Sequence, residues 1–315
     1  MCAVGRGAVP DYGVSIRTYA KRVLRRRDLI PKDAGTVLES SATMTASDPY
    51  TQYALGSTDA EHERLIRQAE WLAPYTEKFF REVGIGSGQR VLDLGSGVGD
   101  VALLLARLVG PSGEVVGIER DAHSIARATE RVSKGGLRQV SFTQGDVSQI
   151  PGGKPFDAAV GRYILMFLPN PVAILRLLSG FIRPGGVVAF QEASFGNFLE
   201  RAASLPLWAL GGALTQETFR RSGTTTDMEP VLPQMLREAG LSVKSTKTEI
   251  LYGAEEWLAG ILHSLLPQMR QFELPFAQLG DFNTLSDRLR AEVAASNSAT
   301  PLPALVSAWA LKPAV

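Results

Sequence analysis

A glycine-rich turn between a strand-like segment and a helix-like segment is the part of this chain best suited to bind a cofactor. It runs from Val91 to Gly99 with the letters VLDLGSGVG, and an apolar helical run over 101–109 follows it. Glycines let the backbone turn tightly and approach a ligand that a Cβ atom would exclude. The free N–H groups at the start of the next helix favour a nearby anionic group. The segment therefore predicts a nucleotide-type cofactor at the carboxyl end of a buried strand.

The spacing of the glycines separates two classes of cofactor. A dinucleotide-binding loop needs the pattern G-x-G-x-x-G, and Asp100 stands where its third glycine would follow Gly95 and Gly97. Asp93 precedes the first glycine by two residues. We expect its carboxylate to face a ligand's ammonium group, whereas a pyrophosphate would be repelled. These features favour S-adenosylmethionine, and an NAD(P)-dependent oxidoreductase is the less favoured alternative.

Two more acidic residues follow the next two strands. Glu119 ends the second strand, where a carboxylate can accept hydrogen bonds from both hydroxyls of a ribose. Asp146 follows the third strand, where it can accept from an adenine amino group while the N–H of Val147 donates to a ring nitrogen. A solvated strand-end charge for Glu119 and a turn-capping role for Asp146 are the alternatives. Ser96 and Arg120, which adjoin these positions, complete this part of the expected cofactor site.

Together these residues resemble those of the class I S-adenosylmethionine-dependent methyltransferases, over about Tyr53 to Leu311. The glycine loop matches the first motif of that family, Glu119 its ribose-binding acid, and Gly145-Asp146 its adenine-binding pair. The resemblance implies a Rossmann-like, doubly wound α/β fold. Its mostly parallel sheet has seven strands in the order 3-2-1-4-5-7-6, with strand seven antiparallel.

The same resemblance implies further contacts to the cofactor. Arg162, just past the fourth strand, would face the methionine part of the cofactor, with a salt bridge on the sheet rim as the alternative. Tyr53, Arg64 and Gln68 look like residues of an N-terminal helix that closes over the cofactor. An arginine fork is well suited to bind a carboxylate. Ordinary roles on a helix surface are the alternative for these three residues.

The segments after the fourth and fifth strands bear on the methyl acceptor. Gly161-Arg162-Tyr163 stands where amino-group-methylating members carry Asn/Asp-Pro-Pro-Tyr, so a small-molecule acceptor is expected, with an O, N or C atom methylated. Segments 156–171 and 183–192 are similar to those of the ubiquinone/menaquinone-biosynthesis enzymes. Glu192 and His263 are weak candidates for a catalytic base. Positioning and desolvation can otherwise supply most of the rate. A non-catalytic S-adenosylmethionine-binding module is the remaining alternative.

The elements that must hold these residues alternate along the chain. Strand-like segments over 90–94, 115–119, 139–144, 156–161 and 187–192 alternate with helix-like ones, bounded by Gly and Pro. This order predicts right-handed crossovers and a mostly parallel sheet. Thr58 and Glu61 form a capping-box pattern that predicts the start of an earlier helix. We also expect helices over 172–182 and 228–239 and strands over 241–252 and 305–311.

Two stretches, about 194–227 and about 254–298, do not follow this alternation. Both are rich in apolar residues and follow strand ends, where insertions lie over the ligand crevice of an open α/β sheet. We expect helical caps that form the acceptor pocket; a thicker core or a dimer face is the alternative. The methyltransferase domain is expected over 44–315. Residues 1–43 are expected to be a disordered basic leader, with a transit peptide or a basic binding arm as alternatives.

The composition disfavours several other classes of function. Lys and Arg number 33 against 32 Asp and Glu, so no overall basic field for nucleic acid is expected. The single cysteine, Cys2, and three histidines far apart in the sequence predict no metal site. No apolar run reaches the roughly 20 residues of a membrane-spanning helix. We therefore expect a cytoplasmic protein with a small-molecule partner, no nucleic acid and no membrane, in an oligomeric state that the sequence leaves open.

Overall fold

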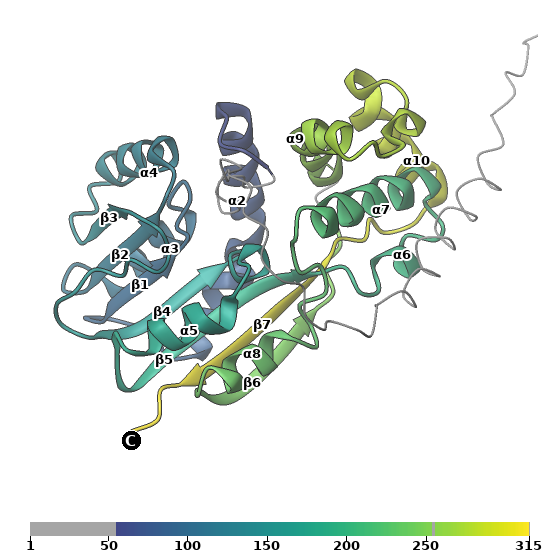
Figure 1. The fold of residues 1–315 in the computed structure, drawn as a ribbon. Helices are drawn as coiled ribbons and strands as arrows, with labels where there is room; N and C mark the ends of the chain where they lie inside the picture. The colour runs from purple at the N-terminus through teal and green to yellow at the C-terminus, as the bar shows by residue number, and fades with distance from the viewer. Residues whose placement is uncertain (1–54, 254–255, 315) are drawn as a thin grey trace, which may run out of the picture.

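The computed structural model describes residues 55–253 and 256–314, and within them one sheet of seven strands forms the centre of the fold (Figure 1). The strand order is β3-β2-β1-β4-β5-β7-β6. Strands β1 to β5 pair in parallel, and β7 is antiparallel to both β5 and β6. The topology implied by the family resemblance is therefore confirmed. The bounds are β1 Arg90–Leu94, β2 Glu114–Glu119, β3 Val140–Gln144, β4 Phe156–Arg162, β5 Ile182–Ser194, β6 Ser242–Glu249 and β7 Ala304–Leu311.

The central strands are apolar along nearly their whole length because helices cover both faces of the sheet. Val91 packs on the face that carries α2 (Asp59–Glu82) and α3 (Asp100–Val109). Leu92, the next residue, packs on the opposite face with α5 (Pro171–Ser179) and α8 (Leu232–Glu238). This alternation follows from the period of two along a strand.

The pairing register brings the ends of several strands to one edge. Asp93 of β1 lies opposite Gly117 of β2 and Val160 of β4. The residues that follow these positions, including the glycine loop after β1 and Glu119 at the end of β2, therefore come out at the same carboxyl edge. This edge is where open α/β sheets bind their ligands. Helix α4 (Ala122–Lys134) packs beside β3, and its first turn lies at the same edge because it directly follows β2.

Both stretches outside the strand–helix alternation are helical in the described residues. The first contains α6 (Phe198–Arg201) and α7 (Pro206–Arg221), and the second contains α9 (Glu256–Gln271) and α10 (Leu285–Ser296). They form a hydrophobic core of their own that also includes Leu72 of α2. Figure 1 shows α2 standing between α3 and α4 on one side and α7, α9 and α10 on the other. The two insertions therefore build one helical layer beside α2.

Two predicted helix boundaries are wrong, and local chemistry explains both. The helix expected to reach Ile182 ends at Ser179, because Ile182 pairs with Phe156 of β4 and starts β5 instead. A short apolar run has no periodicity that distinguishes a helix end from a strand start. The helix expected from Met228 begins only at Leu232. Pro230 disfavours helical geometry in the residue before it, which delays the start.

Some expectations fall outside this structure. Tyr53 and residues 1–43 lie outside the described residues, so their predicted roles stay predictions. In the part of the chain that the structure describes, no helix is both long and apolar enough to cross a membrane.

Candidate active site

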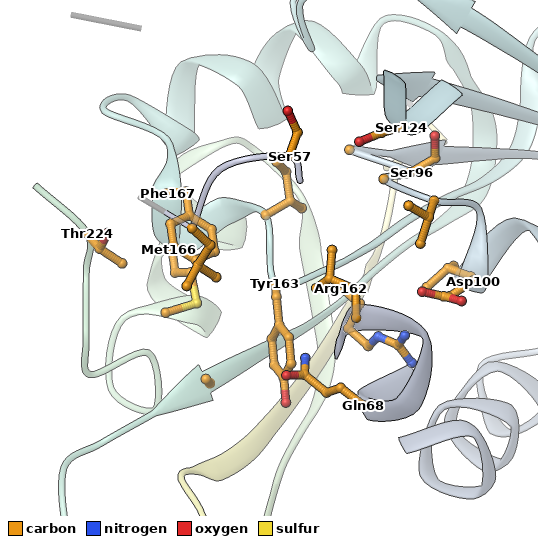
Figure 2. A pocket seen from close by; sticks show the side chains of 18 of the residues that line it. Ser57, Gln68, Ser96, Asp100, Ser124, Arg162, Tyr163, Met166, Phe167 and Thr224 are labelled. Carbon is orange, nitrogen blue, oxygen red and sulfur yellow. The ribbon is translucent and has the colours of Figure 1, made fainter. Parts of the chain in front are cut away.

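A cavity of about 1010 Å³ opens at the carboxyl edge of the sheet. All the predicted cofactor residues line it except Asp93 and the undescribed Tyr53; they are Arg64, Gln68, Gly95, Ser96, Gly97, Glu119, Arg120, Asp146, Val147 and Arg162. Figure 2 shows Ser96, Ser124 and Asp100 at one side of this space. Met166, Phe167 and Thr224 lie at the other side, and Tyr163 and Gln68 lie between them. The cavity thus has a polar part beside the glycine loop and a second part beyond Tyr163.

The glycine loop turns as its sequence requires. Gly95 and Gly97 have φ angles of 67° and 51°, in the left-handed region that favours glycine. A Cβ atom on Gly95 would lie 2.6 Å from Cδ1 of Ile164, so this glycine allows close packing within the protein. A Cβ atom on Gly97 would meet no protein atom within 4 Å. Because Gly97 lines the cavity, its open side is where a ligand can approach the backbone.

Glu119 connects the end of β2 to this loop. Its Oε2 accepts a hydrogen bond from the Gly97 N–H at 2.9 Å, and its Oε1 accepts from the N–H groups of Arg120 and Asp121 at 2.8 and 3.0 Å. These donors orient the carboxylate at the cavity wall. Each carboxylate oxygen can accept more than one hydrogen bond, so ribose hydroxyls can still be accommodated.

Asp146 lines the cavity and also stabilises its own turn. Its Oδ1 accepts hydrogen bonds from the N–H and the hydroxyl of Ser148, at 2.9 and 2.6 Å. Oδ1 of Asp146 therefore has the turn-capping role that was the alternative prediction for this residue. The predicted contacts of Asp146 and Val147 with an adenine ring stay predictions.

Asp93 lies behind the glycine loop and does not line the cavity. It is only 1% exposed, and its Oδ2 has no hydrogen-bond partner in the described residues. Burial raises the pKa of this carboxyl to about 8; the positive charge of Arg162 opposes the shift, and the negative charge of Asp100 adds to it. Asp93 does not line the cavity, because the alternation along β1 directs it toward the face covered by α3, as it does Val91. Its predicted contact with a ligand's ammonium group stays a prediction.

The two arginines predicted to bind the cofactor have different surroundings. Arg162 donates from Nη1 to the hydroxyl of Thr76 on α2 at 3.0 Å, and no carboxylate of the described residues lies within 4.0 Å of its guanidinium nitrogens. Its charge therefore remains available to an anionic ligand group. Arg64 is 6% exposed and already pairs with Glu61, donating from Nε and Nη2 to both carboxylate oxygens at 2.7 and 2.6 Å. In this structure the fork expected to bind a ligand carboxylate is occupied by Glu61.

The Arg64–Glu61 pair also connects α2 to the inserted helices. Nη1 of Arg64 donates to the side-chain oxygen of Gln68 at 2.7 Å, which orients Gln68 at the cavity. Ser264 of α9 donates from its hydroxyl to Oε2 of Glu61 at 2.5 Å. These contacts hold α2 and α9 together above the cavity, so Arg64 contributes to the shape of the site.

Neither weak candidate for a catalytic base lines the cavity. Glu192 is fully buried, and its carboxylate accepts hydrogen bonds from the N–H groups of Ile164, Leu165 and Met166, at 3.2, 2.9 and 3.4 Å. Burial raises the pKa of Glu192 to about 8, and the three N–H donors oppose the shift. His263 places Nδ1 2.8 Å from the carbonyl oxygen of Ala259 on its own helix, away from the acceptor side of the cavity. The observed contacts make Glu192 an anchor for the segment after β4.

Tyr163 stands at the boundary between the two parts of the cavity (Figure 2). Its φ of 56° is unusual for a residue with a side chain, and its N–H donates to the carbonyl of Gln191 at 2.8 Å. Backbone strain of this kind concentrates at functional sites. Burial raises the pKa of the phenol to about 12, so it is neutral at physiological pH. Tyr163 can therefore donate or accept one hydrogen bond at the boundary without acting as an anion.

The part of the cavity beyond Tyr163 is apolar and aromatic. Its walls come from α2, from the segment after β4, from both insertions and from the residues that flank the second one, and they include Trp71, Met166, Phe167, Phe195, Phe219, Leu251, Trp257, Ile261 and Leu302. The described polar neighbours in this part, apart from Tyr163, are Ser222 and Thr224, which do not ionise at ordinary pH. The apolar composition of the insertions was a sequence signal for this pocket.

The structure adds cavity residues that the sequence did not indicate. His62 of α2 and Ser124 of α4 both line the polar part, and Nε2 of the histidine lies 3.1 Å from the serine hydroxyl. These two residues are 62 positions apart. No local pattern could have paired them, because only the packing of α2 against the edge of the sheet brings them together.

Comparison with known proteins agrees with this geometry. Residues 85–240 match a family model described as a methyltransferase domain. The ubiquinone/menaquinone biosynthesis C-methyltransferase UbiE of Pseudomonas aeruginosa is 32% identical over 171 residues, which cover 50% of this chain and 66% of that protein. An arsenite methyltransferase of Aquipseudomonas alcaligenes is 28% identical over 201 residues, covering 55% of this chain and 56% of that protein.

A solved structure shares the fold. The YcgJ protein of Bacillus subtilis superposes with a TM-score of 0.52 at 16% sequence identity, over 76% of this chain and 98% of that one. The chain spans less than two thirds of the length of these two sequence relatives. Residues 85–240 thus match a methyltransferase domain, and about half of the chain is similar to a ubiquinone/menaquinone C-methyltransferase.

Proposed function

We propose that the protein transfers a methyl group from S-adenosylmethionine to a small, largely apolar acceptor. The observation that carries this proposal is a continuous cavity of about 1010 Å³, which joins the glycine loop to an aromatic pocket. Ligand pockets commonly measure about 300–1,000 Å³. This cavity lies at the upper end of that range, which is the size expected where a cofactor and an acceptor bind side by side.

The polar part has donors and acceptors that fit the cofactor. The hydroxyl oxygen of Ser96 is buried without a hydrogen-bond partner in the described residues, and Gly97 leaves its backbone open to the cavity. Glu119 suits ribose hydroxyls, and the charge of Arg162 suits the carboxylate of an amino acid. When bound, S-adenosylmethionine supplies an electrophilic methyl group on a sulfonium. The donor set on this wall therefore suits the adenosine and amino-acid parts of such a molecule.

The lining of the apolar part indicates how the protein would promote methyl transfer to the acceptor. Its described lining holds no side chain that ionises at ordinary pH and could take a proton from the acceptor, since burial raises the pKa of Tyr163 to about 12. We therefore infer that the chain acts mainly by holding the acceptor in line and by excluding water. Oriented approach is worth up to roughly 7–11 kcal/mol of a reaction barrier. An acceptor with its own nucleophilic atom fits this pocket better than one that needs a strong protein base.

The relatives suggest two acceptor classes, and this chain favours one. A thiophilic acceptor such as arsenite needs soft thiolate ligands, and this sequence has one cysteine, Cys2. The aromatic walls of the pocket suit an apolar organic acceptor, such as a reduced quinone or a phenol. A cytoplasmic location and the absence of a nucleic-acid partner stay predictions from the sequence.

The test begins with calorimetric titration of the full chain with S-adenosylhomocysteine, and with NAD and NADP in parallel. Binding of the first alone supports the cofactor assignment, and binding of a nicotinamide cofactor alone overturns it. Formation of S-adenosylhomocysteine is then measured with S-adenosylmethionine and a panel of apolar phenols and reduced quinones, with arsenite for comparison. Release that depends on an apolar acceptor supports the proposed reaction. Cofactor binding with no release by any acceptor supports the alternative of a non-catalytic binding module.

A further inference from the structure

Two histidines and an aspartate meet at the rim of the polar part of the cavity. Asp59 and His62 lie in the first turn of α2, and His123 lies in the first turn of α4. The potential ligand atoms of these three side chains all lie within 4.8 Å of one another. The centroids of the two imidazole rings are 4.6 Å apart. The methyl-transfer chemistry proposed above does not use this histidine cluster.

The hydrogen bonds around the cluster orient its rings. Nδ1 of His123 lies 2.9 Å from the carbonyl oxygen of Ser57, while its Nε2 lies 3.2 Å from Oδ1 of Asp59. Nε2 of His62 lies 3.1 Å from the hydroxyl of Ser124. Histidines that bind metals commonly use their second ring nitrogen in this way, bonded to a carbonyl or another oxygen. Each imidazole therefore has one nitrogen in an orienting contact and one that can coordinate an ion.

A buried and unpartnered nitrogen is the second observation that points to a ligand. His62 is only 1% exposed, and its Nδ1 has no hydrogen-bond partner in the described residues. Buried polar atoms in proteins nearly always have a partner, because leaving one without a partner destabilises the fold. A bound metal ion would satisfy this atom.

We propose that Asp59, His62 and His123 bind one divalent transition-metal ion, for which Zn²⁺ is the natural probe. Imidazole and carboxylate ligands suit such an ion, and three protein ligands leave one tetrahedral position for water. At Zn–ligand distances of about 2.0–2.2 Å, tetrahedral ligand atoms lie about 3.4 Å apart. The oxygen of Asp59 and Nε2 of His123 are already 3.2 Å apart. The side chain of Asp59 is 92% exposed and that of His123 is 52% exposed, so both can move toward an ion bound at the buried His62.

The position of the cluster predicts what the ion does. It would connect the first turn of α2 to the first turn of α4, and His62, Ser57 and Ser124 around it line the cofactor cavity. The ion would therefore hold this end of α2 against α4 beside the polar part of the cavity. Because such an ion binds the folded chain, it also stabilises the fold.

The test is calorimetric titration of the untagged full chain with Zn²⁺, together with thermal unfolding with and without the ion. The expected result is one ion per chain and a rise in melting temperature, with affinity at least tenfold weaker in His123→Ala and in Asp59→Ala. Both residues are exposed, so neither change should unfold the chain, as it could at His62. His263→Ala and Cys2→Ser are the matched controls and should bind Zn²⁺ as the unmodified chain does.

Two results would overturn this assignment. One is the absence of Zn²⁺ binding by the unmodified chain. The other is binding that the His123→Ala and Asp59→Ala variants retain at full affinity, or that a control variant loses. Binding of S-adenosylhomocysteine is measured separately, so the metal site and the proposed function can fail independently.

Discussion

Replacing Gly97 by alanine separates backbone strain from ligand contact. Gly97 has a φ of 51°, and an added Cβ atom would meet no protein atom within 4 Å. The substitution therefore strains the backbone without a clash inside the protein. A residue with a Cβ atom in the left-handed region costs roughly 1–2 kcal/mol. The new methyl group would project into the cavity at the point where the cofactor is expected to approach the loop.

Gly136→Ala is the matched control. Gly136 has a φ of 64°, and a Cβ atom there would also meet nothing within 4 Å, but the residue follows α4 and does not line the cavity. Both variants should lose a similar roughly 1–2 kcal/mol of unfolding free energy in urea titrations. Only Gly97→Ala should also lose affinity for S-adenosylhomocysteine, by tenfold to a hundredfold, which corresponds to about 1.4–2.7 kcal/mol.

If Gly97→Ala shows the expected loss of stability and still binds S-adenosylhomocysteine with unchanged affinity, the cofactor does not approach the backbone of this loop. If both variants lose affinity equally, backbone strain acts on binding from a distance and the loop has no direct contact. Calorimetric titration of both variants under one set of conditions distinguishes these outcomes.

Three further predictions concern other parts of the site and its support. Glu119→Ala should weaken binding of S-adenosylhomocysteine by about 1–3 kcal/mol in calorimetry, because ribose hydroxyls lose a charged partner; unchanged affinity would mean that Glu119 only orients the loop. Glu192 holds its proton more tightly in the folded state, where its pKa is about 8. Its contribution to stability should be complete below its unfolded pKa of about 4.3 and should fall by a few kcal/mol as the pH rises through 8. In Glu192→Gln this fall should be smaller in urea titrations across that range, and the part that remains is due to Asp93, whose pKa burial also raises to about 8; an equally steep fall would contradict the assignment. Trp208 is fully buried and donates from Nε1 to the Pro301 carbonyl at 2.9 Å. Trp208→Ala should therefore cost about 3–5 kcal/mol of unfolding free energy, and a loss below 1 kcal/mol would mean that Trp208 is not packed in the core of the inserted helices.

Much of the fold could be predicted because its signals are local. Thr58 does cap α2, accepting a hydrogen bond from the Glu61 N–H at 3.2 Å, as the capping-box pattern predicts. The apolar runs of the parallel strands and the glycines after β1 are likewise readable in short windows of sequence. The boundary at Ile182 was misjudged because its pairing partner, Phe156, is distant in the sequence.

The direction of individual side chains was predicted less well than the positions of the elements. Asp93 and Glu192 both lie on strands that reach the cavity edge, yet neither lines the cavity. A strand places alternate residues on opposite faces. Which face points to the ligand depends on the helices that cover the sheet. His263 was placed in the correct insertion, but the rotation of α9 directs it away from the acceptor side.

The sequence by itself determined the glycine loop, the acids at the ends of β2 and β3 and the order of strands and helices. Each of these depends on backbone geometry or hydrogen bonding within a few residues. Only the tertiary structure decided the shape of the acceptor pocket, the Glu61–Arg64 contact with α9 and the meeting of His62 with His123. These features join segments that are far apart in the chain, and the packing of α2 between the sheet edge and the inserted helices brings them together.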